Sequence, residues 1–178
     1  MSPPTLNVRA LFDAHYTSVW RLLRRLGVRA AQLDDAAQEV FWVAARKLAQ
    51  IEPGRQHAFL YGVALRVAAS ELRRSARLSE QREPELLEQL CDGAPSPEER
   101  LEQARARALL DEVLDRLPLE LRSVLVLFEL EGLDVRAIAE IEGIPVGTVG
   151  SRLRRAREEF AAAAKRLRAA RLTPRRSA

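Results

Sequence analysis

The stretch GLDVRAIAEIEGIPVGTVGSRLRRAREEF, residues 132–160, predicts two short helices joined by a tight turn. Asp134 is a good N-cap for the first helix, because its carboxylate can accept hydrogen bonds from the free N–H groups of the first turn. Gly143 suits the left-handed end of that helix, and Pro145 suits the start of the next one. The second helix buries four apolar side chains, spaced 4, 3 and 4 residues apart: Val149, Leu153, Ala156 and Phe160. The pattern is that of a helix-turn-helix.

The outward faces of this second helix are small and polar at its start and basic further along. They carry Ser151, Arg152, Arg154, Arg155 and Arg157. Such a helix can place its start in the major groove of DNA while its arginines meet phosphates. A basic amphipathic helix is more often only a solvated surface, but here the turn spacing, the Gly143 and Pro145 positions and the arginines occur together. Together they favour DNA binding.

Charge is distributed unevenly along the 178 residues. Residues 1–77 carry 12 basic and 6 acidic side chains, and residues 146–178 carry 10 basic and 2 acidic ones. Residues 78–100 and 101–145 are both acidic. Two basic blocks around an acidic middle predict two surfaces that face nucleic acid.

Composition predicts an all-α fold of two small helical domains. Hydrophobic residues make up 47% of the chain, alanine, leucine and arginine dominate, and no alternating β-branched run is present. The single cysteine, Cys91, excludes a disulfide framework within the chain, and no metal-ligand spacing occurs. The N-terminus lacks a signal-peptide pattern, and no apolar run approaches the ~18 residues of a membrane span. These features predict a cytoplasmic chain without direct membrane insertion.

The order of periodic segments predicts three parts: a domain over 6–77, a linker over 78–100 and a domain over 101–172. The linker is rich in glutamate, proline and serine and has no sustained periodicity, so we expect it to be flexible. Cys91 lies in it, and an incidental thiol is the favoured interpretation over a regulatory one. Helices are expected at about 6–26, 34–49, 57–78, 97–117 and 119–131, followed by the helix-turn-helix. Ala108, Leu109, Val113, Leu114 and Leu117 are expected to face inward in the fourth helix.

The second expected helix has a polar face opposite its apolar one. Asp35, Gln38, Glu39, Trp42 and Arg46 fall within about 80° on a helical wheel. A large aromatic in the middle of a polar face is a candidate anchor for a protein partner. Packing of Trp42 against a neighbouring loop is an equally good interpretation of the pattern.

The third expected helix is apolar on two sides, which is typical of the central helix of a domain. A narrower strip between those sides carries Gly62, Arg66 and Arg73, and then Arg74 and Arg77. A small residue followed by basic ones would let a nucleic-acid backbone approach closely. The alternative is a solvated edge.

Three segments carry a resemblance to a known family. LDDAAQEVFW (33–42), ELRR (71–74) and the long stretch from 117 to 160 are similar to motifs of the extracytoplasmic-function (ECF) group of bacterial RNA polymerase sigma factors. The resemblance covers about residues 6–77 and 101–168. It implies a region 2 domain, a region 4 domain and promoter-specific transcription initiation without catalytic chemistry, cofactor, metal or small-molecule substrate. It also implies core RNA polymerase, promoter DNA and an anti-sigma factor as partners.

The resemblance also assigns site residues. The surface that would dock on the clamp helices of the largest polymerase subunit comprises Asp34, Asp35, Gln38, Glu39, Trp42 and Arg46. The non-template strand of the −10 element would meet Lys47, Gln56, His57 and Phe59, together with the strip residues Gly62, Arg66, Arg73 and Arg74. The −35 duplex would be read by Thr148, Gly150, Ser151, Arg152, Arg154 and Arg155.

The chain departs from the family pattern at three of its positions. Arg66 stands where asparagine is common, and Ser70 where aspartate is common. Arginine offers only donors, whereas asparagine can also accept, which bears on the −10 base preference. Gly150 stands where a basic side chain is frequent, so one −35 contact is expected to be missing.

Two other classes of function are less well supported by the sequence. The first is a helix-turn-helix activator that dimerises on a palindrome without docking on polymerase, which leaves the Trp42 face unexplained. The second is an enzyme. His15 and His57 lie far apart in the sequence, and no nucleophile elbow, P-loop or H-E-x-x-H motif is present. The acidic pairs Asp34-Asp35 and Glu98-Glu99 are interpreted as helix N-terminal charges rather than catalytic carboxylates.

Overall fold

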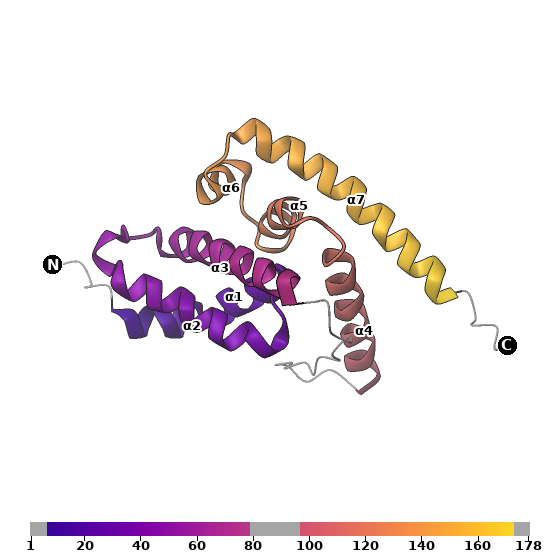
Figure 1. Cartoon of the computed structure of the whole chain (residues 1–178), viewed down its shortest axis with the longest axis horizontal. Coiled ribbons are helices and arrows are strands. Elements are labelled where there is room, and N and C mark those ends of the chain that lie inside the picture. Colours follow the sequence, from indigo (N-terminus) through magenta and orange to yellow (C-terminus); the bar gives the residue numbers. More distant parts are fainter. Residues whose placement is uncertain (1–6, 79–96, 173–178) are drawn as a thin grey trace.

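All regular structure in the described residues is helical. The computed structural model describes residues 7–78 and 97–172, and the predicted all-α class is confirmed there. The N-terminal group comprises α1 (Val8–Arg25), α2 (Ala30–Arg46), the 3-10 turn η1 (Leu48–Gln50) and α3 (Gln56–Leu78). The C-terminal group comprises α4 (Pro97–Leu114), α5 (Leu119–Leu125), the π-helical turn η3 (Val126–Leu130), α6 (Val135–Glu142) and α7 (Val146–Leu172). The two groups lie side by side, with α3 facing α5 and α6 (Figure 1).

The N-terminal group is a three-helix core in which each helix packs on the other two. Leucines and alanines recur every three or four residues and so fall on one face of each helix. The fully buried side chains are Val19, Leu22, Leu23, Leu26, Ala37, Val40, Ala44, Leu60, Ala64 and Ala68. Burying one such leucine contributes about 2 kcal/mol. The small alanine side chains allow α2 and α3 to approach each other closely. The polar residues of these two helices lie on their outward faces.

Helix α2 begins at Ala30, four residues before the predicted start at Asp34. Asp34 therefore lies inside the helix, and its Oδ1 accepts hydrogen bonds from the Tyr16 hydroxyl at 3.1 Å and from Trp20 Nε1 at 3.0 Å. Both donors belong to α1. The interpretation of Asp34 and Asp35 as helix N-terminal charges was wrong, because Asp34 instead ties α2 to α1.

The C-terminal group is built around α5 and η3, which are buried on nearly every side. Leu121, Val124, Leu125 and Phe128 face inward as predicted, although Phe128 is only partly buried. Arg122 and Ser123 are also buried, which the apolar pattern did not predict. Ala108 of α4 was predicted to face inward but is exposed, because α4 contributes its last turns, at Val113 and Leu114, to the core.

The helix-turn-helix forms as the sequence predicts. Asp134 accepts from the backbone N–H groups of Arg136 and Ala137 at 2.8 and 2.9 Å. Gly143 ends α6 in the left-handed conformation, with φ of 69°. Helix α7 then buries Val149, Leu153 and Ala156 against α5 and α6.

Several sequence predictions fall on residues outside the described ranges. Most of the predicted linker, with Cys91, lies in residues 79–96, and both ends of the chain, 1–6 and 173–178, lie outside as well. Among the described helices, none combines the length and the apolar character that crossing a bilayer requires.

Candidate nucleic-acid and partner interfaces

The outward face of α2 is a continuous exposed surface. Asp35, Gln38, Glu39, Trp42 and Arg46 are all exposed, as the helical wheel predicts. The Trp42 side chain is 66% exposed, so the alternative in which it packs against a neighbouring loop is wrong. The Arg46 guanidinium carbon lies 5.2 Å from the centre of the indole ring, within range of a cation–π contact. Asp34, the sixth residue predicted for this surface, is exposed but accepts hydrogen bonds from α1.

The Trp42 indole is informative because it remains 66% exposed although the Arg46 guanidinium lies over its ring. Tryptophan contributes more contact area than any other side chain and is enriched at the energetic centres of protein interfaces. Charged and amide groups surround it on the same face, which resembles the polar rim of an interface. The α2 face is therefore a candidate docking surface for a protein.

The predicted strip along α3 is covered at Gly62, whereas Arg66, Arg73 and Arg74 are exposed. Gly62 is buried, and a Cβ built at this position would lie 3.5 Å from the backbone carbonyl oxygen of Ile141 in α6. Arg66 lies beside it and lines an open groove of about 310 Å³. The groove is shared between the two helical groups, with Gln50, Ile51, Glu52, Arg55, Ala58 and Phe59 on one side and Glu140 and Ile141 on the other. The solvated-edge alternative is therefore wrong at Gly62, which α6 covers.

The two predicted basic residues further along α3 differ in their surroundings. Arg73 and Arg74 are both exposed. Arg74 forms an ion pair at 2.7 Å with Glu71, whose side chain is almost wholly buried. Of these two exposed arginines, Arg74 is thus held in place by a neighbouring carboxylate.

The residues predicted between α2 and α3 gather at the start of α3. Lys47 is exposed at the C-cap of α2, whereas Gln56, His57 and Phe59 are half-buried. The His57 ring lies 3.9 Å from the ring of Tyr61 and 6.1 Å from that of His15, centre to centre. Burial and the nearby His15 lower the pKa of His57. The histidines that are distant in sequence are thus brought together.

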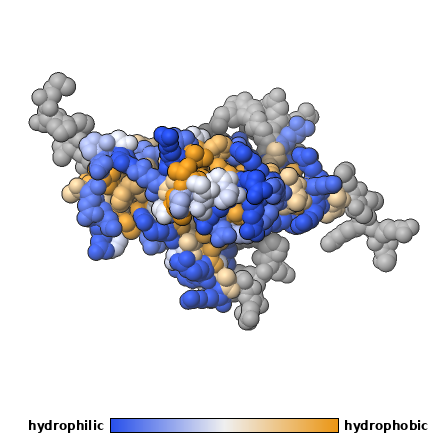
Figure 2. Space-filling model, turned by 90° about the horizontal axis from the view of Figure 1, so that it is seen from above, coloured by the Kyte–Doolittle hydropathy of each residue, from blue (hydrophilic) through white to orange (hydrophobic). Residues whose placement is uncertain are grey.

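The start of α7 presents an uncharged surface. Val146, Gly147, Gly150 and Ser151 are exposed, and Thr148 is half-buried. The Ser151 hydroxyl donates to the Thr148 carbonyl at 2.9 Å. Seen from the side of α6 and α7, the molecule shows a pale and orange area near its middle, bordered by hydrophilic side chains (Figure 2). Small uncharged side chains followed by the exposed Arg154 and Arg155 fit a helix end that enters a DNA groove.

The three arginines of α7 that were predicted to read the −35 duplex differ in their surroundings. Arg154 and Arg155 form exposed ion pairs with Glu158 and Glu159, one turn on, at 3.2 and 2.8 Å. Exposed pairs of this spacing contribute only about 0.3–0.5 kcal/mol, so a DNA phosphate can replace the glutamate. Arg152 points inward, 3.2 Å from Glu142 of α6, and burial raises the pKa of that carboxyl. Arg152 therefore belongs to the packing of the helix-turn-helix rather than to its free surface.

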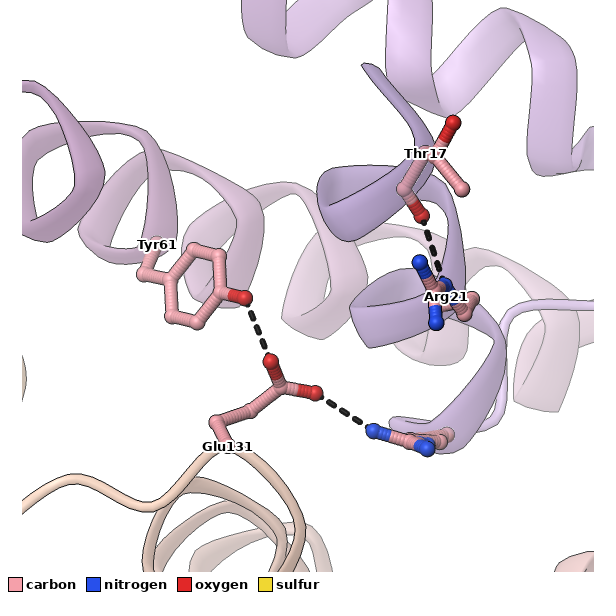
Figure 3. A network of polar contacts seen from close by, with 5 residues as sticks. Thr17, Arg21, Tyr61 and Glu131 are labelled. Atoms are coloured by element: carbon pink, nitrogen blue, oxygen red, sulfur yellow. Dashed lines mark hydrogen bonds and ion pairs between the residues drawn. The ribbon is translucent and has the colours of Figure 1, made fainter. Parts of the chain in front are cut away.

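A set of polar contacts between the two helical groups has no signal in the sequence pattern. Glu131 accepts from the Tyr61 hydroxyl at 2.5 Å and pairs with Arg25 at 2.6 Å (Figure 3). Arg24 pairs with Asp111 at 2.5 Å. Each of these residues looks like an ordinary solvated or core residue in its own helix. Only the tertiary arrangement shows that they meet.

Two protein-family models match the chain, one over each helical group. The model described as Sigma-70 region 2 matches residues 11–78, and the one described as Sigma-70, region 4 matches residues 107–160. The match over residues 11–78 argues against the activator alternative, because a helix-turn-helix activator needs no region 2 domain.

The curated relatives that match this chain include ECF sigma factors and other sigma factors. SigE of Mycolicibacterium smegmatis is 31% identical over 84% of this chain, and the chain spans 58% of that protein. FecI of Escherichia coli, a ferric citrate uptake sigma factor, is 33% identical over 82% of this chain and 83% of its own length. The sigma-E factor of Haemophilus influenzae is 30% identical over 83% of this chain and 82% of its own length.

Two solved structures share this fold. CnrH, solved with the cytosolic domain of CnrY, has a TM-score of 0.63 at 24% identity, over 87% of this chain and 85% of its own. RpoE of Bartonella quintana, solved with the anti-sigma factor NepR, has a TM-score of 0.68 at 19% identity, over 88% and 96%. The chain belongs to the ECF group of the sigma-70 family and is a promoter-specific transcription initiation factor of RNA polymerase.

Proposed function

We propose that this sigma factor docks on the clamp helices of the largest polymerase subunit through the α2 face. It reads the −10 non-template strand with the α2–α3 junction and the α3 strip, and the −35 duplex with the start of α7. Region 2 then corresponds to residues 6–77 and region 4 to residues 101–172, joined by a linker over 78–100. The chain acts by binding alone and carries out no catalytic chemistry.

The exposed side chain of Trp42 is the observation that carries this proposal. The Trp42 indole, which is 66% exposed and lies beside an arginine, leaves a large apolar surface in water. A partner that covers the ring removes this surface from water, which favours binding. A partner on the α2 face would leave the start of α7 available for DNA, because α2 presents this face away from its own core. Arg66 and Gly150 would then set base preferences that differ from the commoner family pattern.

We also propose an inhibitory protein partner. CnrH and RpoE were each solved with another protein, and NepR is an anti-sigma factor. An anti-sigma factor of this chain would cover the same surfaces that polymerase and promoter use. The factor would act in the cytoplasm, where polymerase lies, and the anti-sigma factor could hold it at the membrane.

Run-off transcription with purified core polymerase tests this function. A library of promoter fragments is transcribed with and without the full chain, and we expect start sites that appear only when the chain is added. Aligned upstream sequences from those fragments should show shared −35 and −10 elements. No chain-dependent transcript from any fragment, with normal DNA binding by the chain alone, would contradict the proposal.

The docking surface is tested separately by binding to core polymerase. Trp42→Ala should weaken binding at least tenfold, which corresponds to the loss of about 1.4 kcal/mol or more expected at an aromatic interface centre. Asp13→Ala changes an exposed residue of α1 and serves as the control, with binding unchanged. Full-strength binding of Trp42→Ala would remove the α2 face from the proposal while leaving the transcription test intact.

A further inference from the structure

The groove beside α3 contains an arginine whose donors are free. Arg66 is exposed and forms no ion pair with any residue of the described ranges 7–78 and 97–172. The two carboxylates that line the same groove, Glu52 and Glu140, pair with Arg55 instead. A guanidinium has five N–H donors and no acceptor, so Arg66 can bind only a group that accepts hydrogen bonds.

An aromatic ring lies on the same face of α3. Phe59 precedes Arg66 by seven residues, which is about two helical turns, so both side chains fall on one face and both line the groove. Phe59 is half-buried and packs against the core. The Arg66 guanidinium is directed back towards it, because Nη2 lies 3.9 Å from the position of a Cβ at Gly62. The groove thus combines a fixed aromatic ring with a free guanidinium.

This combination suits one unpaired nucleobase. The groove has a volume of about 310 Å³, at the small end of ligand pockets, so it fits a single base better than a stack of several. The bases of a single strand stack on aromatic side chains and expose their edges to hydrogen-bonding groups. Phe59 can stack with any base, whereas the edge that meets Arg66 decides which base is held.

The edges of guanine match the groups in this groove. Guanine has two neighbouring acceptors, O6 and N7, to which one arginine can donate two hydrogen bonds. Adenine has the donor N6–H₂ beside N7, so one N–H of Arg66 would meet another donor. The Glu52 carboxylate accepts only, and its exposed pair with Arg55 at 3.8 Å is weak. It suits the neighbouring N1–H and N2–H₂ donors of guanine, a pair that the other three bases lack.

We propose that Arg66 makes −10 recognition by this factor selective for a guanine in the non-template strand, with the base stacked on Phe59. The inference rests on the proposed function of the α3 strip and deepens it by naming the base. The groups that it uses, Phe59, Arg66 and Glu52, all belong to region 2. Arg66 donates to O6 and N7, and Glu52 accepts from the opposite edge of the base.

Base substitutions in a promoter test this selectivity. A promoter from the run-off screen is transcribed by the holoenzyme with each of the four bases, in turn, at every −10 position. At one position guanine should give about tenfold more transcript than adenine, because a two-bond contact between arginine and guanine discriminates by this order. Arg66→Asn should shift the preference towards adenine at that position alone, because asparagine pairs with N6 and N7 of adenine.

Arg73→Asn is the matched control. Arg73 is exposed on the same helix and has no ion pair among the described residues, but it does not line the groove. The substitution should weaken binding to all promoter variants alike and reduce its salt dependence by about one ion. A change of base preference as large as that of Arg66→Asn would overturn the assignment of the selectivity to Arg66.

A modified base tests the contact at a single atom. In 7-deazaguanine a C–H group replaces N7, which removes one of the two acceptors. The holoenzyme should bind a fluorescent −10 non-template strand about fivefold more weakly when this base replaces the selected guanine, the loss expected for one hydrogen bond. The Arg66→Asn holoenzyme should bind both strands equally. Equal binding by the wild type would overturn the proposed contact.

The transcription results separate this inference from the function on which it rests. Chain-dependent transcripts without a guanine preference at any −10 position would overturn the inference and leave the proposed function standing. A preference for cytosine at the position that Arg66→Asn changes would do the same. Absence of every chain-dependent transcript would overturn the proposed function and the inference with it.

Discussion

Arg152 and Arg154 lie two residues apart in α7 and face different surroundings. Arg152 meets Glu142, a carboxylate with 9% of its side chain exposed, whereas the Arg154 side chain is 75% exposed. One oxygen of Glu142 is buried without a hydrogen-bond partner, and Ser123 and Arg152 are the neighbours that favour the charged form of this carboxyl group. The same residue type therefore serves the packing of the helix-turn-helix at one position and the DNA surface at the other.

Substitution by methionine should separate these two roles. Arg152→Met leaves the Glu142 carboxylate without its cation and should lower the free energy of unfolding by about 2–3 kcal/mol. The loss should be smaller at more acid pH, since burial raises the pKa of Glu142 and protonation removes the unpaired charge. Urea denaturation at two pH values measures both effects, and adding Glu142→Gln should recover part of the loss.

Arg154→Met is the matched control for that substitution. Its effect on the free energy of unfolding should stay within about 0.5 kcal/mol, because the pair that it breaks is exposed. It should instead weaken binding to −35 duplex DNA and reduce the salt dependence of that binding by about one ion. Equal destabilisation by both substitutions would contradict the assignment of separate roles.

His57 makes the stability of region 2 depend on pH. Burial and His15 of α1 lower its pKa, while Glu131 of region 4 opposes them. The unfolded chain therefore takes up this proton more readily, near pH 6.5. The contribution of neutral His57 to the free energy of unfolding is complete above that pH. It is lost as the pH falls through the pKa of His57 in the unfolded chain towards its lower pKa in the folded chain. Between about pH 7.5 and 5.5 the wild type should lose more stability in urea denaturation than His57→Gln, and equal losses would exclude His57 as the source.

The turn between α6 and α7 illustrates what a short element requires of its residues. Gly143 has φ of 69°, which costs a residue with a Cβ about 1–2 kcal/mol. Gly147 lies in the first turn of α7, with open space around the position of a Cβ. Gly143→Ala should therefore lower the free energy of unfolding by about 1 kcal/mol. Gly147→Ala should raise it by up to about 0.5 kcal/mol, because alanine has a higher helix propensity than glycine. Effects of the same sign in thermal denaturation would contradict this account of the turn.

Local elements were predictable because their signals are local. The Asp134 cap, the Gly143 end and the α2 face each depend on residues within a few positions of one another. The start of α2 was misplaced because Asp34 resembles an N-cap, and only the folded chain brings Tyr16 and Trp20 to it. The contact between regions lies beyond such signals, since the residues that pair in it are 70 or more positions apart. The interaction roles assigned to individual site residues remain predictions.

At the scale of the whole molecule, the two tryptophans offer a selective probe. Trp20 and Trp42 both lie in region 2, and the chain contains no others. Tryptophan fluorescence therefore follows the unfolding of region 2, whereas far-UV circular dichroism follows all helices. Coincidence of the two melting curves is a test of cooperative unfolding. The polar contacts between region 2 and region 4 predict that the curves of the wild type coincide at low salt.

Neutralising the region 2 side of the contact should uncouple the curves. Arg24→Gln with Arg25→Gln removes the partners of Asp111 and Glu131 from the end of α1. Loss of about 1 kcal/mol shifts the midpoint of a domain of this size by about 4–8 °C, so the fluorescence and dichroism midpoints should separate by several degrees. Arg9→Gln, on the exposed start of the same helix, should leave them together. Curves that stay coincident in the double variant would mean that apolar packing and Arg122, which donates to the Leu26 carbonyl of region 2, couple the regions, and that the ion pairs only orient them.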